Sequence, residues 1–254
     1  MRGLMWPFVA TALTLSLGFT AVGAMRAEDK AKADEKTPLN TLTDAEKNAG
    51  WKLLFDGKTT KGWRRYKGKT IGDKWKVIDG ALVKQKQGKV GGDIVSQDQY
   101  DNFELSIEWR ISEGGNSGIM YRVTEDLDAP YMSGPEYQLL DNAKHEDGKH
   151  KRTSAASCYA LYAPSKDLTK PVGEWNKTRL VVNGNHIEHW LNGEKVVTYE
   201  IGSDDWNHRV KNSKFKEWDR FGKEKKGHID LQDHGDEVAF RNIKIKQLTG
   251  KKEK

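Results

Sequence analysis

The stretch NFELSIEWRISEGGNSGIMYRV at positions 102–123 decides the fold class. Apolar side chains alternate with polar ones at 103–110, and successive side chains of a β-strand point to opposite faces. Positions 113–118 hold three glycines, an Asn and a Ser, which are residues that tolerate tight turns. A second, mostly apolar segment follows at 119–123. The stretch predicts two strands joined as a hairpin, whose acids and Arg122 face either solvent or a polar groove.

Turn signals divide the rest of the chain into further short strands. The dipeptides at 79–80, 183–184 and 192–193 are Asp-Gly or Asn-Gly, which are strong signals for two-residue hairpin turns. They predict a hairpin at 75–84 and a three-stranded meander at 175–199. Further strands are expected at 51–55, 93–96, 136–140, 157–162, 228–232 and 238–246.

Helix signals are few. Thr43 and Glu46 form a capping-box pattern, which predicts a short helix ending near position 50, and part of 212–218 is also expected to be helical. No helix alternates with the strands, so we do not expect a parallel α/β sheet. The sequence predicts an all-β fold, in which two antiparallel sheets pack as a jelly-roll sandwich.

The N-terminus has the pattern of a secretory signal. Arg2 supplies a basic start, an apolar run follows at 6–19, and small residues lie at 22–24 and at Ala27. The run is shorter than the ~20 residues that a membrane-spanning helix needs, so we expect no permanent membrane anchor. We predict a signal peptide at 1–27, a flexible spacer at 28–42, one domain at 43–248 and a basic tail at 249–254. The protein is thus expected to be exported, to the periplasm or beyond the cell.

Composition narrows the possible partners. The formal net charge is +6, but no nucleic-acid-binding motif accompanies the basic residues, so we expect solvated faces and no nucleic acid. Nine Trp and eight Tyr can fill a sandwich core or stack on sugar rings. The only cysteine, Cys158, permits no internal disulfide and is expected to be a buried apolar residue.

Polar residues at alternate strand positions are the candidates for chemistry. Glu136 and Gln138 share a strand face, and Asp141 would join them if a bulge intervened. This spacing is similar to that of jelly-roll glucanases, but a Gln stands in place of the middle acid, which disfavours a conventional glycosidase. Gln232 and His234 share a face of a later strand, and His234 lies in a Gly-containing turn where a general base could reach substrate.

A divalent cation such as Ca²⁺ is an open alternative. It requires six or more oxygen ligands, and no EF-hand-type loop is present. The aspartates that could contribute are Asp126, Asp128, Asp141 and Asp147.

Short motifs over nearly the whole chain after Leu42 follow the order of one family. They include WKLLFDG at 51–57, WKVIDG at 75–80, FELSIEWRI at 103–111, GGNSGIMYR at 114–122, PEYQLLDN at 135–142, WLNG at 190–193, LQDHG at 231–235 and FRNIK at 240–244. Together they resemble the 3-keto-disaccharide hydrolase domain family, whose members share the concanavalin A-like jelly roll and are mostly exported.

The resemblance implies cleavage of oligosaccharides or other glycosides already oxidised to a ketone at C3. The carbonyl acidifies the C2 hydrogen, so a base can remove it, a donor or cation can hold the enolate, and an acid can assist departure of the C1 oxygen. Water addition would complete net hydrolysis.

Residue type and position suggest which side chains would act. The hypothesis assigns catalysis to Glu136 or His234 as the base, with Glu108 orienting partners. Substrate or metal contacts are assigned to Arg122, Gln138, Asn116, Gln232 and Asp141. A non-catalytic carbohydrate-binding sandwich that uses Trp platforms is the alternative. The enzymatic reading predicts that Glu108, Arg122, Glu136 and His234 converge in one hollow.

Overall fold

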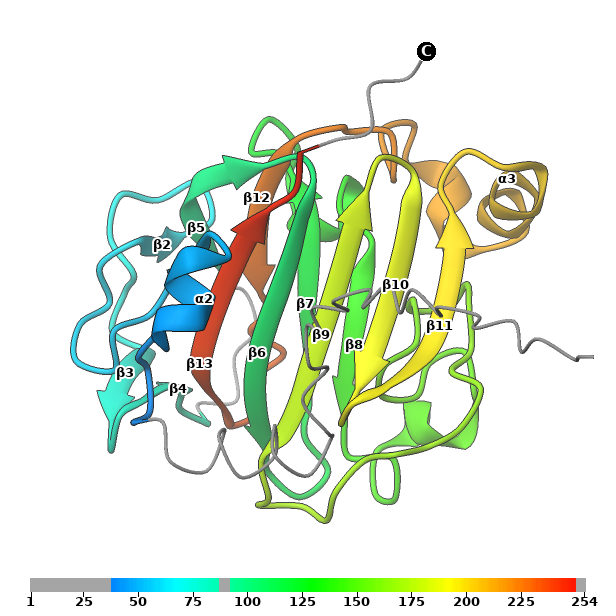
Figure 1. Cartoon of the computed structure of the whole chain (residues 1–254). Coiled ribbons are helices and arrows are strands. Elements are labelled where there is room, and N and C mark those ends of the chain that lie inside the picture. Colours follow the sequence, from blue (N-terminus) through cyan, green and yellow to red (C-terminus); the bar gives the residue numbers. More distant parts are fainter. Residues whose placement is uncertain (1–37, 87–91, 250–254) are drawn as a thin grey trace, which may run out of the picture. The chain divides into compact units, whose positions relative to one another are not determined.

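Two antiparallel β-sheets form the structure, a computed structural model that describes residues 38–86 and 92–249 (Figure 1). The eight-stranded sheet has the order β11 (Glu194–Glu200), β10 (His186–Leu191), β9 (Asn176–Asn183), β6 (Phe103–Ile111), β13 (Val238–Gln247), β4 (Ala81–Lys84) and β3 (Trp75–Ile78), and β1 (Trp51–Leu53) also pairs with β13. The five-stranded sheet has the order β2 (Trp63–Arg65), β5 (Ile94–Tyr100), β12 (Gly227–Leu231), β7 (Asn116–Val123) and β8 (Glu136–Leu140). The predicted all-β sandwich is confirmed.

The alternating pattern of β6 explains how the sheets meet. Its apolar positions, from Phe103 to Ile111, are buried in the main core, whereas the intervening polar residues are half-buried on the opposite face. Tyr137 and Leu139 of β8 and Ile229 of β12 enter the same core from the other sheet. Burial of this apolar surface between the two sheets is the main driving force for the sandwich.

The helices are short and lie at the margins. α2 (Asp44–Asn48) begins at the expected capping box, in which the Glu46 amide donates to the Thr43 hydroxyl (3.1 Å) and the Thr43 amide donates to the Glu46 carboxylate (2.8 Å). It lies against β13, where Lys244 pairs with Glu46 (2.8 Å) (Figure 1). The other helical segments are α3 (Asp204–Lys211), η1 (Pro130–Met132), η2 (Glu146–Lys149) and η3 (Lys214–Glu217).

Two expectations about strand pairing are wrong. β6 and β7 do not form a hairpin, because β6 pairs with β9 and β13 whereas β7 pairs with β8 and β12, so the link at 112–115 crosses from one sheet to the other. The segment 157–162 is not a strand, since only isolated bridges join Cys158 to Tyr137 and Tyr162. Ala156 and Ala160 have positive φ angles of 67° and 60°, which interrupt an extended backbone there.

Several other local predictions are confirmed, although β7 begins at Asn116, inside the expected turn, and β5 extends beyond the expected strand at 93–96. β3 and β4 form the expected hairpin, and β9, β10 and β11 form the expected meander. Cys158 is free and buried. In the part of the chain that the structure describes, no helix is both long and apolar enough to cross a membrane. The predicted signal peptide at 1–27, most of the spacer and all but the first residue of the tail lie outside the described residues.

A buried ion pair joins the two sheets at one end of the sandwich. Lys84 of β4 lies 2.7 Å from Asp233, which follows β12, and both side chains are 0% exposed. Lys74 lies 3.6 Å from the second oxygen of Asp233. The Lys84 ammonium also donates to the Gln85 carbonyl (2.9 Å), so the buried cation has a second partner.

We expect Lys84→Met to lower the free energy of unfolding by roughly 3 kcal/mol, because removal of one partner leaves the other charge buried and poorly compensated. Urea denaturation at neutral pH measures the change. Lys76→Met is the control, since Lys76 is exposed on the neighbouring strand β3 and should change stability by less than about 0.5 kcal/mol. Equal losses in the two variants would contradict a special role for the pair.

Candidate active site

A cavity of about 620 Å³ lies over the outer face of the five-stranded sheet. Its floor comes from β7, β8 and the turn after β12, and its walls come from loops near 65–67, 128–131 and 214–215. The side chains that line it are Arg65, Tyr66, Lys67, Asp93, Asn116, Asp128, Ala129, Pro130, Tyr131, Glu136, Gln138, Tyr159, Lys214, Phe215, Gln232, Asp233 and His234. This set combines titratable groups, amides and three tyrosines, as expected of a site for a polar ligand with flat apolar faces.

Five of the eight residues proposed from the sequence meet in this cavity. They are Asn116, Glu136, Gln138, Gln232 and His234. They come from three separate elements, β7, β8 and the segment after β12, which are neighbours in the five-stranded sheet. The period of two along β8 places Glu136 and Gln138 on the outer face while Tyr137 and Leu139 fill the core.

Glu136 is the acid at the floor of the cavity. It is paired with Met120 across the β7–β8 ladder, and it is buried. Burial raises the pKa of Glu136 to about 8, helped by the negative charges of Asp93 and Asp147 and opposed by the Lys214 cation. A Cβ atom at Gly118 would collide with the Glu136 carboxyl group, so the glycine provides the space that this side chain occupies.

The floor of the cavity carries two side-chain amides, and one of them contacts the Glu136 carboxyl. In the orientation of Gln138 that satisfies both ends of its amide, the nitrogen donates to Glu136 Oε1 (3.0 Å) and to the Ser117 carbonyl (3.1 Å). The Asn116 amide nitrogen lies 3.4 Å from Nε2 of His145. The floor therefore presents hydrogen-bonding groups that are fixed by β7 and β8 before any ligand arrives.

Asp230 lies on the same face of the sheet as Glu136, and its carboxyl group has no hydrogen-bond partner among the described residues. It pairs with Met120 and Val95 on the neighbouring strands, it is 0% exposed, and neither carboxyl oxygen has a hydrogen bond. Burial, with Asp93 and Glu136 nearby, holds the pKa of Asp230 well above its ordinary value. Burial likewise raises the pKa of Asp93 to about 7. Three buried carboxyl groups in or near the cavity, those of Glu136, Asp93 and Asp230, thus retain their protons to a higher pH than ordinary acids do.

Lys214 supplies a positive charge to the cavity. Its ammonium group lies 4.4 Å from the centroid of the Tyr159 ring, a cation–π distance. The Tyr159 hydroxyl donates to Asp147 (3.0 Å), which fixes the ring. Lys214, Tyr159 and Asp93 were not proposed from the sequence, because each lies in an irregular segment or at a strand margin where periodicity carries no information.

His234 lies in the turn after β12 and is exposed. The preceding Asp233 anchors this turn, because its carboxylate pairs with Lys84 and accepts from the Gly235 amide (2.9 Å). Gly235 has a φ of +96°, which other residues rarely adopt. The His145 ring lies 6.3 Å from the His234 ring at a near-perpendicular angle. The imidazole of His234 is thus held at the mouth of the cavity on a fixed backbone.

Glu108 and Arg122 do not line the cavity, so the expected convergence is wrong for both. Glu108 lies on the outer face of the other sheet, where Arg241 (2.7 Å) and Asn242 (2.8 Å) donate to it. Arg122 has a φ of +57°, which interrupts the alternation of β7. Its guanidinium donates instead to the carbonyls of Gly184 (2.6 Å) and Asp101 (3.3 Å).

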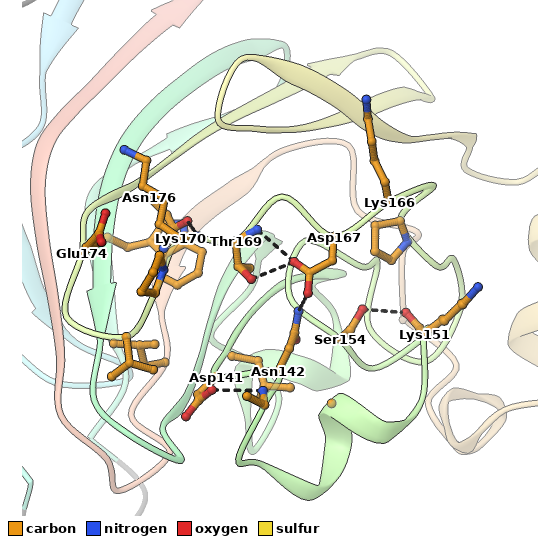
Figure 2. A pocket seen from close by; sticks show the side chains of 18 of the residues that line it. Asp141, Asn142, Lys151, Ser154, Lys166, Asp167, Thr169, Lys170, Glu174 and Asn176 are labelled. Carbon is orange, nitrogen blue, oxygen red and sulfur yellow. Dashed lines mark hydrogen bonds between the residues drawn. The ribbon is translucent and has the colours of Figure 1, made fainter.

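Asp141 lines a different cavity of about 750 Å³ (Figure 2). No bulge brings it beside Glu136; its carboxylate accepts from the amides of Gly114 (2.8 Å) and Ala143 (3.0 Å). Asn142 donates to Asp167 (2.9 Å) across the same cavity (Figure 2). These bonds hold the loops near 141–154 and 164–176 together. Although this cavity is larger, it holds neither the buried Glu136 nor His234, and we place the chemistry in the smaller one.

The four aspartates considered for Ca²⁺ are dispersed. Asp126 pairs with Arg220, Asp128 lies 3.7 Å from Lys67, and Asp147 accepts from Tyr159. Within residues 38–86 and 92–249, no three His, Cys, Asp or Glu side chains lie close enough together to hold a metal ion.

The fold and the cavity together define a jelly-roll sandwich protein with an acid-floored pocket on one sheet. Residues 50–246 match the sequence model of the 3-keto-alpha-glucoside-1,2-lyase-like domain, and the chain belongs to this family.

A curated relative agrees with this assignment. A protein named 3-keto-disaccharide hydrolase from Bacteroides thetaiotaomicron is 37% identical over 174 residues, which cover 59% of this chain and 60% of that protein. The chain thus spans about 60% of the length of this curated relative.

Solved structures from Parabacteroides distasonis share the fold. One, provisionally assigned as a glycosyl hydrolase, is 37% identical with a TM-score of 0.77 and covers 83% of this chain and 100% of that one. A second, with the same provisional assignment, is 28% identical with a TM-score of 0.60 and covers 78% of this chain and 99% of that one.

We expect Asp230→Asn to stabilise the protein at alkaline pH. Because the pKa of Asp230 is raised on folding above its ordinary value of 3.8, its contribution to stability is fully present below about pH 4 and is lost as the pH rises. The amide has the same shape and does not titrate. Thermal denaturation should show equal stability at pH 4 and a higher melting temperature for the variant at pH 8. A variant less stable than wild type at pH 8 would show that the carboxyl makes a contact that an amide cannot replace.

Proposed function

We propose that the protein cleaves glycosides whose sugar ring carries a ketone at C3, by elimination across C1 and C2 followed by hydration. The single observation that carries the proposal is the meeting of a buried Glu136, whose pKa is about 8, with His234 and Lys214 in one cavity of about 620 Å³. The family match and the relative named 3-keto-disaccharide hydrolase support the same substrate class.

The C3 carbonyl makes the reaction possible with these groups. His234 removes the C2 proton, and the electrons of the C2–H bond pass to the carbonyl oxygen as an enolate. Lys214 and the amide group of Asn116 stabilise that oxygen. As the enolate collapses, the C1–C2 double bond forms, the C1–O bond breaks, and the leaving oxygen takes a proton. Addition of water across the new double bond completes net hydrolysis.

The surroundings of Glu136 suit this residue to act as the general acid. At neutral pH a carboxyl group with a pKa of about 8 is mostly protonated, so it can donate to the leaving oxygen. His234 is exposed at the mouth of the cavity and is the remaining candidate for the base. The raised pKa of Glu136 therefore supports the proposal that Glu136 is the acid and His234 is the base.

Two other functions fit the site less well. A conventional retaining glycosidase needs two carboxyls ~5 Å apart that act as acid and nucleophile, and Gln138 occupies the neighbouring position on β8. A non-catalytic carbohydrate-binding module would not need a buried acid at the floor. Burial of such a group opposes folding, which favours a catalytic use for it.

We also propose that the protein is exported. The support is the sequence of residues 1–27, with its basic start, apolar run and small residues.

We expect purified protein to release the leaving alcohol from a 3-keto-glucoside and not from the unoxidised parent. Glu136→Gln should lower kcat/KM by about 10²- to 10⁴-fold, the usual contribution of a positioned acid or base. Glu108→Gln is the matched control, because this acid lies on the other sheet and should leave kcat/KM within about twofold of wild type. Binding of the keto-glycoside by wild type without any release would instead identify a binding module.

The assignment of Glu136 as acid predicts a dependence on pH and on the leaving group. Because only its protonated form donates, kcat/KM for an alkyl 3-keto-glucoside should fall above about pH 8. A 4-nitrophenol leaving group needs no proton, so both this alkaline fall and the defect of Glu136→Gln should largely disappear with the nitrophenyl substrate. An equal defect on both substrates would show that Glu136 acts as the base.

A further inference from the structure

Tyr131 is an exposed aromatic residue at the wall of the cavity. It lies in η1 (Pro130–Met132), the residue is 41% exposed, and it lines the cavity together with Pro130 and Asp128. Large apolar side chains this exposed are uncommon among the described residues. The other two tyrosines of the cavity use their hydroxyls within the protein, since Tyr66 donates to backbone carbonyls and Tyr159 donates to Asp147. The part of the chain that the structure describes offers no such partner to the Tyr131 hydroxyl.

A series of aromatic rings connects Tyr131 to the core. Its ring centroid lies 5.0 Å from that of Trp218, and Trp218 lies 5.7 Å from Phe215. Phe215 stacks on Phe221 at 4.0 Å, and both are buried. Each ring therefore limits the movement of the next, and the orientation of Tyr131 is set by buried neighbours.

The segment that carries Tyr131 is also fixed at both ends. On its N-terminal side, the Arg64 guanidinium donates to both oxygens of Glu125 (2.5 and 2.6 Å). On its C-terminal side, the Gly222 amide donates to the Ser133 carbonyl (2.8 Å). A ring held in this way loses little conformational freedom when a ligand stacks on it.

We propose that Tyr131 is the stacking platform for the leaving-group ring of the substrate, so that the site selects disaccharides and other glycosides with a cyclic leaving group. This inference rests on the proposed function and names the substrate class of the same site. The oxidised ring must lie over the floor, where Glu136 and Gln138 are buried. The leaving oxygen stays within reach of Glu136 at the floor, and the leaving ring beyond it extends toward the exposed wall. Tyr131 offers it a flat apolar face and a hydroxyl that can bond to its ring substituents.

The test compares two substrates that differ only in the leaving group. We expect Tyr131→Ala to raise KM for a 3-keto-disaccharide by about 3- to 10-fold and to leave KM for methyl 3-keto-glucoside within twofold. Tyr131→Phe keeps the ring and should stay near wild type. Val172→Ala is the control, because Val172 is 44% exposed and lies outside this cavity. An equal rise in KM for both substrates would overturn the inference, since it would indicate a contact with the oxidised ring or a loss of folding.

A binding measurement separates this inference from the proposed function. If wild type releases nothing from either substrate, the proposed function fails, and saturation-transfer NMR with the 3-keto-disaccharide still tests the platform. Saturation of aromatic protons should reach the unoxidised ring most strongly, and Tyr131→Ala should abolish that preference. Transfer mainly to the oxidised ring, an unchanged pattern in the variant, or no transfer at all would each refute the platform.

Discussion

The buried ion pair between Lys84 and Asp233 is the contact on which the arrangement of the site depends. Lys84 belongs to the eight-stranded sheet and Asp233 follows a strand of the five-stranded sheet, so the pair fixes one sheet relative to the other at the end where the cavity opens. The Asp233 amide donates to the Asp93 carboxylate (2.8 Å). A Cβ atom at Gly92 would lie only 2.6 Å from the Asp233 carboxylate. The ion pair and the close packing hold Asp233 in place, and they thereby fix the backbone position of the next residue, His234.

Burial decides the electrostatics of the floor. The Lys214 cation stabilises the ionised form of Glu136, yet the net effect raises its pKa, because loss of water around a carboxylate outweighs attraction to an exposed ammonium. Asp230 and Asp93 follow the same rule. The outer face of the sheet therefore carries a carboxyl group that is mostly protonated at neutral pH, and Gly118 provides the room for this side chain. The energetic penalty of these buried acids is offset by the large apolar core between the sheets.

Where the backbone is regular, the period of two along a strand correctly predicts which side chains share a face. It placed Glu136 and Gln138 together on β8, and a turn containing Gly235 placed His234 at the cavity mouth. It failed at Arg122, where one positive φ angle turns the side chain toward the β9–β10 turn. For Glu108, alternation predicts that the side chain faces away from the core. It leaves open to which of the two sheets the strand of Glu108 belongs. Lys214 lies in η3 and Tyr159 in a loop, where the period of two gives no information about the direction of a side chain.

The sequence by itself determined most of the strands, the Asn-Gly and Asp-Gly turns, the capped helix and the sandwich class, because these depend on neighbours within a few residues. Only the tertiary structure decided that β6 and β7 belong to different sheets, and that Asn116, Glu136 and His234 share one cavity whereas Glu108 and Asp141 lie elsewhere. The physical reason is that strand pairing is a long-range choice. A link of four residues at 112–115 can close a hairpin or cross a sandwich, and the burial of β7 between β8 and β12 selects the crossing.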